Sequence, residues 1–366
     1  MKKLLLIILL CPFFVMQCYA EDLGSQIGTI TQADLVETSL PEEVRTISGA
    51  LRLDAGYDTE GALKRLYSSF MSQCKERLSS SIRSAAELFL IALLCAITES
   101  FCETTVIREA VDRIGCCIAS LFVFGNFSSV VDETADAVRT LTDYAHVALP
   151  ILFTTAAAGG GIVSASTRFA SACLSMDVML TIAQSWIIPL IYMFFSVSVS
   201  QSLYENNLLQ AASRISKWCV TSALTVLAMA FGAYLSLTGL IAGSGDALAV
   251  KTARTVLSRS LPVVGGLLSD SAAVLLSAAA LVKNSVGVFA LIAVCALCIG
   301  PVAAFSVKLL VFKAVAAAID FLPGARLPKL VSAMSSVYAM LLGLIGCCAS
   351  IFFIAIVSGI KVVSPL

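Results

Sequence analysis

Asp270 is the carboxylate whose position in the sequence most favours chemistry inside a membrane. It lies near the middle of the apolar segment 261–282, where an ionised side chain is costly, so it is expected to be protonated, paired or exposed to water. Carboxylates of this kind commonly serve proton or ion movement. Five others could lie at a membrane surface if a segment boundary moves by a few residues: Glu87, Glu99, Glu103, Asp177 and Asp320. The sequence therefore predicts one intramembrane carboxylate candidate, Asp270.

The remaining reactive side chains form no catalytic or metal-binding pattern. His146 is the single histidine, and its position at the start of a predicted span favours a structural role. The sequence has neither an HExxH motif nor a Walker loop. Cysteine in an apolar run behaves as a small hydrophobic residue. Eight of the 13 cysteines lie in such runs: Cys95, Cys116, Cys117, Cys219, Cys295, Cys298, Cys347 and Cys348. We therefore expect no enzyme activity, no metal site and no cofactor.

The composition is that of a membrane protein. Hydrophobic residues make up 58% of the 366-residue chain and charged residues only 13%, whereas soluble proteins carry about 25% charged residues. Lipid must therefore provide part of the solvent. The formal net charge of +0 gives no indication of a nucleic-acid partner.

The first 20 residues have the features of a signal peptide. Two lysines precede an apolar stretch at 4–16, and small residues suit cleavage after Ala20. A lipoprotein signal with Cys18 as the lipidated residue is less favoured, because the bulky Gln17 precedes it. If residues 1–20 are a signal peptide, the mature chain begins outside the cytoplasm.

Residues 21–83 are predicted to form an exported helical segment, and 84–366 a polytopic membrane domain. The exported segment is polar and carries many charges. Its second half has one apolar stripe at helical spacing, which could pack on the protein or lie on the membrane surface, or alternatively dock a partner. The stripe consists of Leu63, Leu66, Tyr67, Phe70, Met71, Cys74, Leu78 and Ile82.

The membrane domain is predicted to be an all-α bundle of about eight membrane segments. Long uncharged intervals mark five of them clearly, because about 20 apolar residues suffice to cross a bilayer: 145–166, 178–200, 218–242, 285–307 and 333–360. Three weaker candidates could be tilted or re-entrant: 84–101, 114–131 and 261–282.

The basic residues predict an orientation for these eight segments. With the N-terminus outside, the cytoplasmic loops would be 102–113, 167–177, 243–260 and 308–332. They hold ten Lys and Arg residues, against five in the opposite loops and tail. This bias agrees with the positive-inside rule, and it places the loop 201–217 outside.

Glycines and prolines in the apolar segments predict either close packing or broken helices. Gly159, Gly160 and Gly161 follow three alanines, and small residues let helices approach closely in lipid. The alternative is a helix break beside a site, which protein or water would have to satisfy. Pro189 and Pro301 are expected to kink two further spans. Packing is the favoured interpretation.

Several stretches together resemble one family. They are "SLPEEVRTISGALRL", "GALKRLYSSF", "TTAAAGGG" and "FLPGARLPKLVSAMSSVYAMLLGLIG". In the order of these stretches, in its length and in its general residue composition, the chain resembles the stage III sporulation protein AE family. The resemblance implies a role in endospore formation and a place in the mother-cell-derived outer forespore membrane. It also implies a channel or secretion-like complex that joins mother cell and forespore. Its other members would be stage III sporulation membrane proteins and a cytoplasmic ATPase. The family supplies no catalytic residues.

A stand-alone secondary transporter with a site near the broken helices is the alternative function. Such a protein is expected to show an internal inverted repeat and paired buried charges. The stretches around Pro150–Gly161 and Pro262–Gly266 do not align convincingly as a repeat. A subunit of a membrane complex is therefore the first hypothesis.

Overall fold

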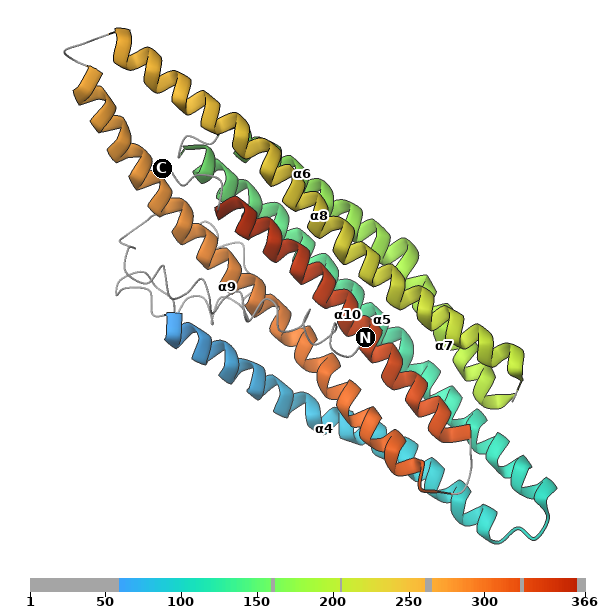
Figure 1. Ribbon diagram of the computed structural model, residues 1–366. Coiled ribbons are helices and arrows are strands. Elements are labelled where there is room, and N and C mark those ends of the chain that lie inside the picture. Colours follow the sequence, from blue (N-terminus) through green and yellow to red (C-terminus); the bar gives the residue numbers. More distant parts are fainter. Residues whose placement is uncertain (1–58, 159–161, 205, 261–264, 323–325, 361–366) are drawn as a thin grey trace.

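The computed structural model shows long helices packed side by side (Figure 1). It describes residues 59–158, 162–204, 206–260, 265–322 and 326–360. This part of the chain contains no strand. The elements are α4 (Thr59–Ser100), α5 (Thr105–Ala158), α6 (Ile162–Ile182), the π-helical turn η2 (Ala183–Ile187), α7 (Ile188–Leu203), α8 (Asn207–Ser260), α9 (Gly265–Ile319) and α10 (Arg326–Ile360).

The prediction of an all-α membrane protein is confirmed. Five helical segments are long and apolar enough to cross a bilayer: Lys64–Ser100, Thr105–Thr154, Phe169–Leu203, Ala290–Ile319 and Arg326–Val357. They were found among the described residues only, and the total of about eight segments stays a prediction. The signal peptide at 1–20 and the first part of the exported segment lie outside the described residues.

The structure corrects the expected boundaries of three segments. The segment 145–166 is wrong as a single span, because α5 ends at Ala158 and α6 begins at Ile162. The segment 114–131 lies on the same helix as 145–158, since α5 continues through the charged stretch between them. The segment 84–101 is the second half of α4, which passes residue 83 without a break.

The helices run alternately up and down the bundle (Figure 1). The C-terminal ends of α4, α7 and α9 lie together, and Tyr204 follows α7 there, so we call this the Tyr204 end. The C-terminal ends of α5 and α8 lie toward the opposite end (Figure 1). At 1.5 Å per residue, the 54 residues of α5 extend over about 80 Å. A bilayer core is only about 30 Å thick, so the long helices extend beyond it.

Helix α10 forms the centre of the bundle. It packs against α5, α6, α7, α8 and α9, whereas α4 packs on α5 and α9. Its apolar side chains are accordingly buried, among them Leu341, Ile345, Phe352 and Ile356. The ring of Phe352 lies edge-on against Tyr144 of α5, with 5.7 Å between the centroids.

The outer face of α5 is apolar as well. Ile114, Ile118, Leu121 and Phe124 recur at helical spacing, and their exposed fractions run from 44 to 75%. In water such a stripe would be a liability. In a bilayer it faces hydrocarbon, so 114–131 has the outer surface expected of a membrane segment.

One turn of π-helix interrupts the long helix formed by α6 and α7. In η2 the N–H of Ile188 donates to the carbonyl of Ala183, five residues earlier. Pro189 follows at the start of α7, and proline lacks the N–H that a regular helix interior uses. The wider turn therefore lies where the regular hydrogen-bond ladder is interrupted.

The alternation of the helices also differs from the predicted topology. Residues 201–217 were expected on the opposite side of the membrane from 102–113 and 308–332. The structure places the α7–α8 connection at the same end as the C-terminal ends of α4 and α9 (Figure 1). The difference arises because two helices each unite two of the expected segments: α5 contains 114–131 and most of 145–166, and α9 contains most of 261–282 and all of 285–307.

Reporter fusions distinguish the two topologies. If each long helix crosses once, fusions after Tyr204 and after Leu322 report from the same side, and a fusion after Ser260 from the other side. The eight-segment topology instead places Ser260 with Leu322 and Tyr204 opposite. The measurement is the activity of a paired cytoplasmic and extracytoplasmic reporter at the three positions. Agreement between Ser260 and Leu322 would contradict the arrangement in Figure 1.

Candidate functional site: a basic pocket at one end of the bundle

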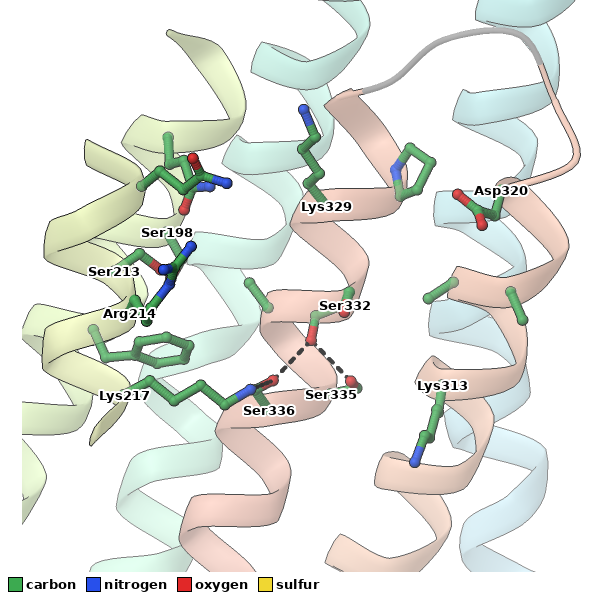
Figure 2. A pocket seen from close by; sticks show the side chains of 17 residues that line it. Ser198, Ser213, Arg214, Lys217, Lys313, Asp320, Lys329, Ser332, Ser335 and Ser336 are labelled. Carbon is green, nitrogen blue, oxygen red and sulfur yellow. Dashed lines mark hydrogen bonds between the residues drawn. The ribbon is translucent and has the colours of Figure 1, made fainter. Parts of the chain in front are cut away.

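A cavity of about 630 Å³ lies between α7, α8, α9 and α10. It is near the Tyr204 end, because its lining comes from the last turns of α7 and α9 and the first turns of α8 and α10. Figure 2 shows α10 in the middle, with α8 on one side and α9 on the other. We call this cavity the basic pocket.

Among the residues that the structure describes, four cationic side chains and one carboxylate line the basic pocket. Arg214 and Lys217 come from α8, Lys313 from α9 and Lys329 from α10, and the carboxylate is Asp320. Arg214 and Lys217 are three residues apart, which places them on one face of α8. The four positive charges and one negative charge give the described part of the lining a net charge of +3.

Serine hydroxyl groups connect the helices around the pocket. Ser198 of α7 and Ser213 of α8 are hydrogen bonded with 3.0 Å between their oxygen atoms. The Nζ of Lys217 donates to the Oγ of Ser336 on α10 at 2.9 Å, and Figure 2 shows this side chain reaching across to α10. The Oγ of Ser336 donates in turn to the carbonyl of Ser332. The hydroxyl groups thus hold α7, α8 and α10 around the cavity.

Arg326 fixes three helices beside the pocket. It is the first residue of α10, and only 7% of it is exposed. Its Nε lies 3.2 Å from Oδ2 of Asp112 on α5, and its Nη1 donates to the carbonyl of Leu203 at 2.7 Å. Leu203 is the last residue of α7, whose final carbonyl groups have no partner within the helix. Arg326 therefore ties together α5, α7 and the start of α10.

Glu133, in the charged part of α5, connects this helix to two others, α4 and α9. Its Oε2 lies 2.8 Å from the Nζ of Lys308 on α9, and its Oε1 lies 3.3 Å from Nη1 of Arg77 on α4. One carboxylate thus forms ion pairs with two cations and links α4, α5 and α9. The charged stretch of α5 that resembles a loop in the sequence is a point of helix contact.

Replacing Glu133 with glutamine is expected to lower the free energy of unfolding by about 1–2 kcal/mol. The change removes the charge that both cations share and leaves Lys308 without its partner. Asp136→Asn is the matched control, because Asp136 is exposed on the same helix and should cost less than about 0.5 kcal/mol. Thermal unfolding in neutral detergent measures both variants. Equal stabilities would show that Glu133 does not hold the helices together.

The described residues of the pocket lining include neither histidine nor cysteine, and the groups that they offer are suited to electrostatic and hydrogen-bond recognition. Across the described helices, no group of three or more His, Cys, Asp and Glu side chains is placed to hold a metal ion. The described cysteines are all free, and Cys116, Cys347 and Cys348 are buried.

The chain is related to one known protein family. A family model described as stage III sporulation protein AE matches residues 50–362. The chain belongs to the stage III sporulation protein AE family. This membership and the five apolar helices identify a sporulation membrane protein.

The stage III sporulation protein AE of Bacillus subtilis (strain 168) is a curated relative of this family member. The two are 22% identical over 239 residues, which cover 64% of this chain and 59% of the relative. The match therefore spans less than two thirds of the relative. No solved structure matches the chain.

The glycines and prolines singled out in the sequence of this family member lie in different parts of the chain. Gly159, Gly160 and Gly161 lie outside the described residues, between the end of α5 and the start of α6. Pro189 follows η2, and Pro301 lies within α9. The structure does not bring Pro189 or Pro301 into the lining of the basic pocket.

The carboxylates singled out in the sequence of this family member also lie in different parts of the chain. Asp270 belongs to α9 near its start, and its side chain lies outside the described ones. Asp177 is exposed and meets His146 of α5, with 2.9 Å between Oδ1 and Nε2. Glu99 is buried. Among the carboxylates singled out in the sequence whose side chains the structure describes, Asp320 is the one that lines the pocket.

The four cations of the basic pocket in this stage III sporulation protein AE family member were not among the predicted site residues. In the sequence, Arg214, Lys217, Lys313 and Lys329 indicate only sides of the membrane, with the first two opposite the others. The three-residue spacing of Arg214 and Lys217 beside Ser213 is a local signal of a polar helix face. Their convergence with α9 and α10 depends on the tertiary fold.

Proposed function

We propose that this protein is an integral membrane subunit of a sporulation-specific channel or secretion-like complex that links mother cell and forespore. The observation that carries the proposal is the family match over residues 50–362. The apolar helices support a place within the membrane. In this role the protein is required for endospore formation.

The partners in the proposal are other stage III sporulation membrane proteins and a cytoplasmic ATPase. The ATPase supplies energy from outside this chain, and the lipid bilayer surrounds its helices. The mother-cell-derived outer forespore membrane is the proposed location. The length of the helices supports an assembly role, because α5 and α9 extend beyond the bilayer core and offer surface to neighbouring proteins.

A deletion strain tests the proposal. Loss of the protein should stop spore development after engulfment, and expression of the intact chain should restore spores. An affinity-tagged chain from sporulating cells should co-purify with stage III sporulation membrane proteins, and a vegetative membrane protein carrying the same tag is the control. Normal sporulation in the deletion strain would overturn the required role. Purification without those partners would overturn the role as a complex subunit.

A further inference from the structure

We propose that the basic pocket binds the phosphate group of an anionic phospholipid headgroup. The recognising groups are the cations of α8, α9 and α10 and the serine hydroxyls between them. A soluble phosphate could use the same groups, but the surroundings of the pocket favour a lipid. This site is distinct from the assembly role proposed above and does not depend on it.

The charge of the pocket is the first argument. Elsewhere between helices, Lys308 and Arg326 meet carboxylates. In the pocket, by contrast, the described structure gives Arg214 and Lys313 no ion-pair partner, and Lys217 bonds to the neutral hydroxyl of Ser336. Cations that surround one cavity repel each other, and this repulsion is weakly screened near a low-dielectric membrane. An anion held between them removes the repulsion.

The types of donor fit a phosphate group. Arg214 offers a planar set of N–H groups that can bond two phosphate oxygens at once, and the lysines act as compact positive charges. Serine hydroxyls can donate further hydrogen bonds. Ser213 and Ser336 line the same cavity as these cations. Several donors on three helices can thus surround an anion with three or four oxygens.

The apolar side chains near the pocket favour a lipid as the source of the phosphate. Four apolar or aromatic residues there are at least 60% exposed: Tyr204, Leu208, Ile215 and Trp218. Tyr204 directly follows α7, and the other three lie on the first part of α8, which also carries Arg214 and Lys217. Tyrosine and tryptophan are enriched where a membrane meets water. Basic pockets between membrane helices are suited to anionic headgroups. An acyl chain could lie on this exposed apolar surface while the headgroup occupies the pocket.

A binding measurement with a matched pair of variants tests the proposal. The full chain is purified in neutral detergent, and short-chain phosphatidylglycerol is titrated against it, with phosphatidylcholine as the neutral lipid. The pocket variant is Arg214→Gln/Lys217→Gln/Lys313→Gln. The control variant is Lys64→Gln/Lys75→Gln/Arg139→Gln, which removes the same charge from exposed sites outside the pocket.

The pocket variant should bind phosphatidylglycerol about 100-fold more weakly than the natural chain, since each basic residue near an anionic lipid contributes roughly a fivefold effect. The affinity of the control variant for phosphatidylglycerol should fall by less than about threefold. If the triple variant does not fold, Lys313→Gln alone changes one exposed side chain and should weaken binding about fivefold. Circular dichroism and gel filtration establish the folded state of each variant.

Competition between inorganic phosphate and phosphatidylglycerol is a separate measurement. Binding of phosphatidylglycerol that millimolar inorganic phosphate does not displace supports a lipid headgroup. If inorganic phosphate displaces phosphatidylglycerol at a similar affinity, and the pocket variant loses binding of both to the same extent, the pocket binds soluble phosphate and the lipid source is overturned. Equal lipid binding by the pocket and control variants would overturn the site itself. None of these results depends on sporulation.

Discussion

Arg326→Ala is expected to lower the free energy of unfolding by about 3–5 kcal/mol, because it removes the cation of a largely buried ion pair. Arg326 and Asp112 have side chains that are only 9% and 13% exposed. The change also removes the donor to the last carbonyl of α7. Both effects act at the point where α5, α7 and α10 meet. Thermal unfolding in neutral detergent and the amount of protein in the membrane measure the loss.

Two further variants separate the charge from the packing. Arg113→Ala removes an exposed partner of Glu109 on the same helix as Asp112, and an exposed pair of this kind contributes less than about 1 kcal/mol. The double variant Arg326→Met/Asp112→Leu leaves neither charge unpaired, so it should recover a large part of the stability. A double variant as unstable as Arg326→Ala would show that the ion pair is not the cause.

Gly115→Leu is expected to cost about 3 kcal/mol, at the upper end of what overpacking of a core usually costs. A Cβ on Gly115 would overlap the Sγ of Cys95 on α4, and the side chain of Leu327 on α10 lies 3.9 Å from the same position. Helices in lipid gain stability from close van der Waals contact, so added bulk at this contact separates α4 from α5. Unfolding temperature and protein level are the measurements.

Gly125 provides the matched control on the same helix. A Cβ there would have no neighbour within 4 Å, so Gly125→Ala should be neutral or stabilise the helix by up to about 1 kcal/mol. Gly115→Ala should destabilise by about 1–3 kcal/mol, and the second change Cys95→Ala should reverse part of this loss. If Gly115→Ala and Gly125→Ala behave alike, the contact between α4 and α5 is not tight.

The long apolar helices could be predicted from the sequence alone. The segments 285–307 and 333–360 overlap the observed Ala290–Ile319 and Arg326–Val357 over most of their length, because uninterrupted apolar runs of this length have few alternatives. The charged stretch between the expected segments 114–131 and 145–166 was predicted to lie outside any membrane segment. Its helix could have been inferred, since Val131, Val138, Leu141 and Ala145 are buried along one face at helical spacing.

The partners of that stretch could not be inferred in the same way. Glu133 meets Arg77 and Lys308, which are 56 and 175 residues away in the chain. The basic pocket has the same origin, because its four cations come from three helices whose order around α10 is a property of the packed bundle. A sequence pattern reports which residues share one helix face, and it carries little information about which faces meet.

The π turn η2 sets the angular phase between the two halves of one helix. Met179, Ala183, Ile187 and Ile191 are all buried and lie four residues apart, although twelve residues of regular α-helix rotate about 120° beyond three full turns. The extra residue of the π turn takes back about 100° of this excess, so all four side chains face the bundle. Deleting one residue between 183 and 187 would therefore rotate the 16 residues of α7 as a unit. Phe195 would then lose its stacking contact with Phe127, whose ring centroid lies 4.1 Å away. The same deletion in the connection to α8 would leave the angular phase of both helices unchanged.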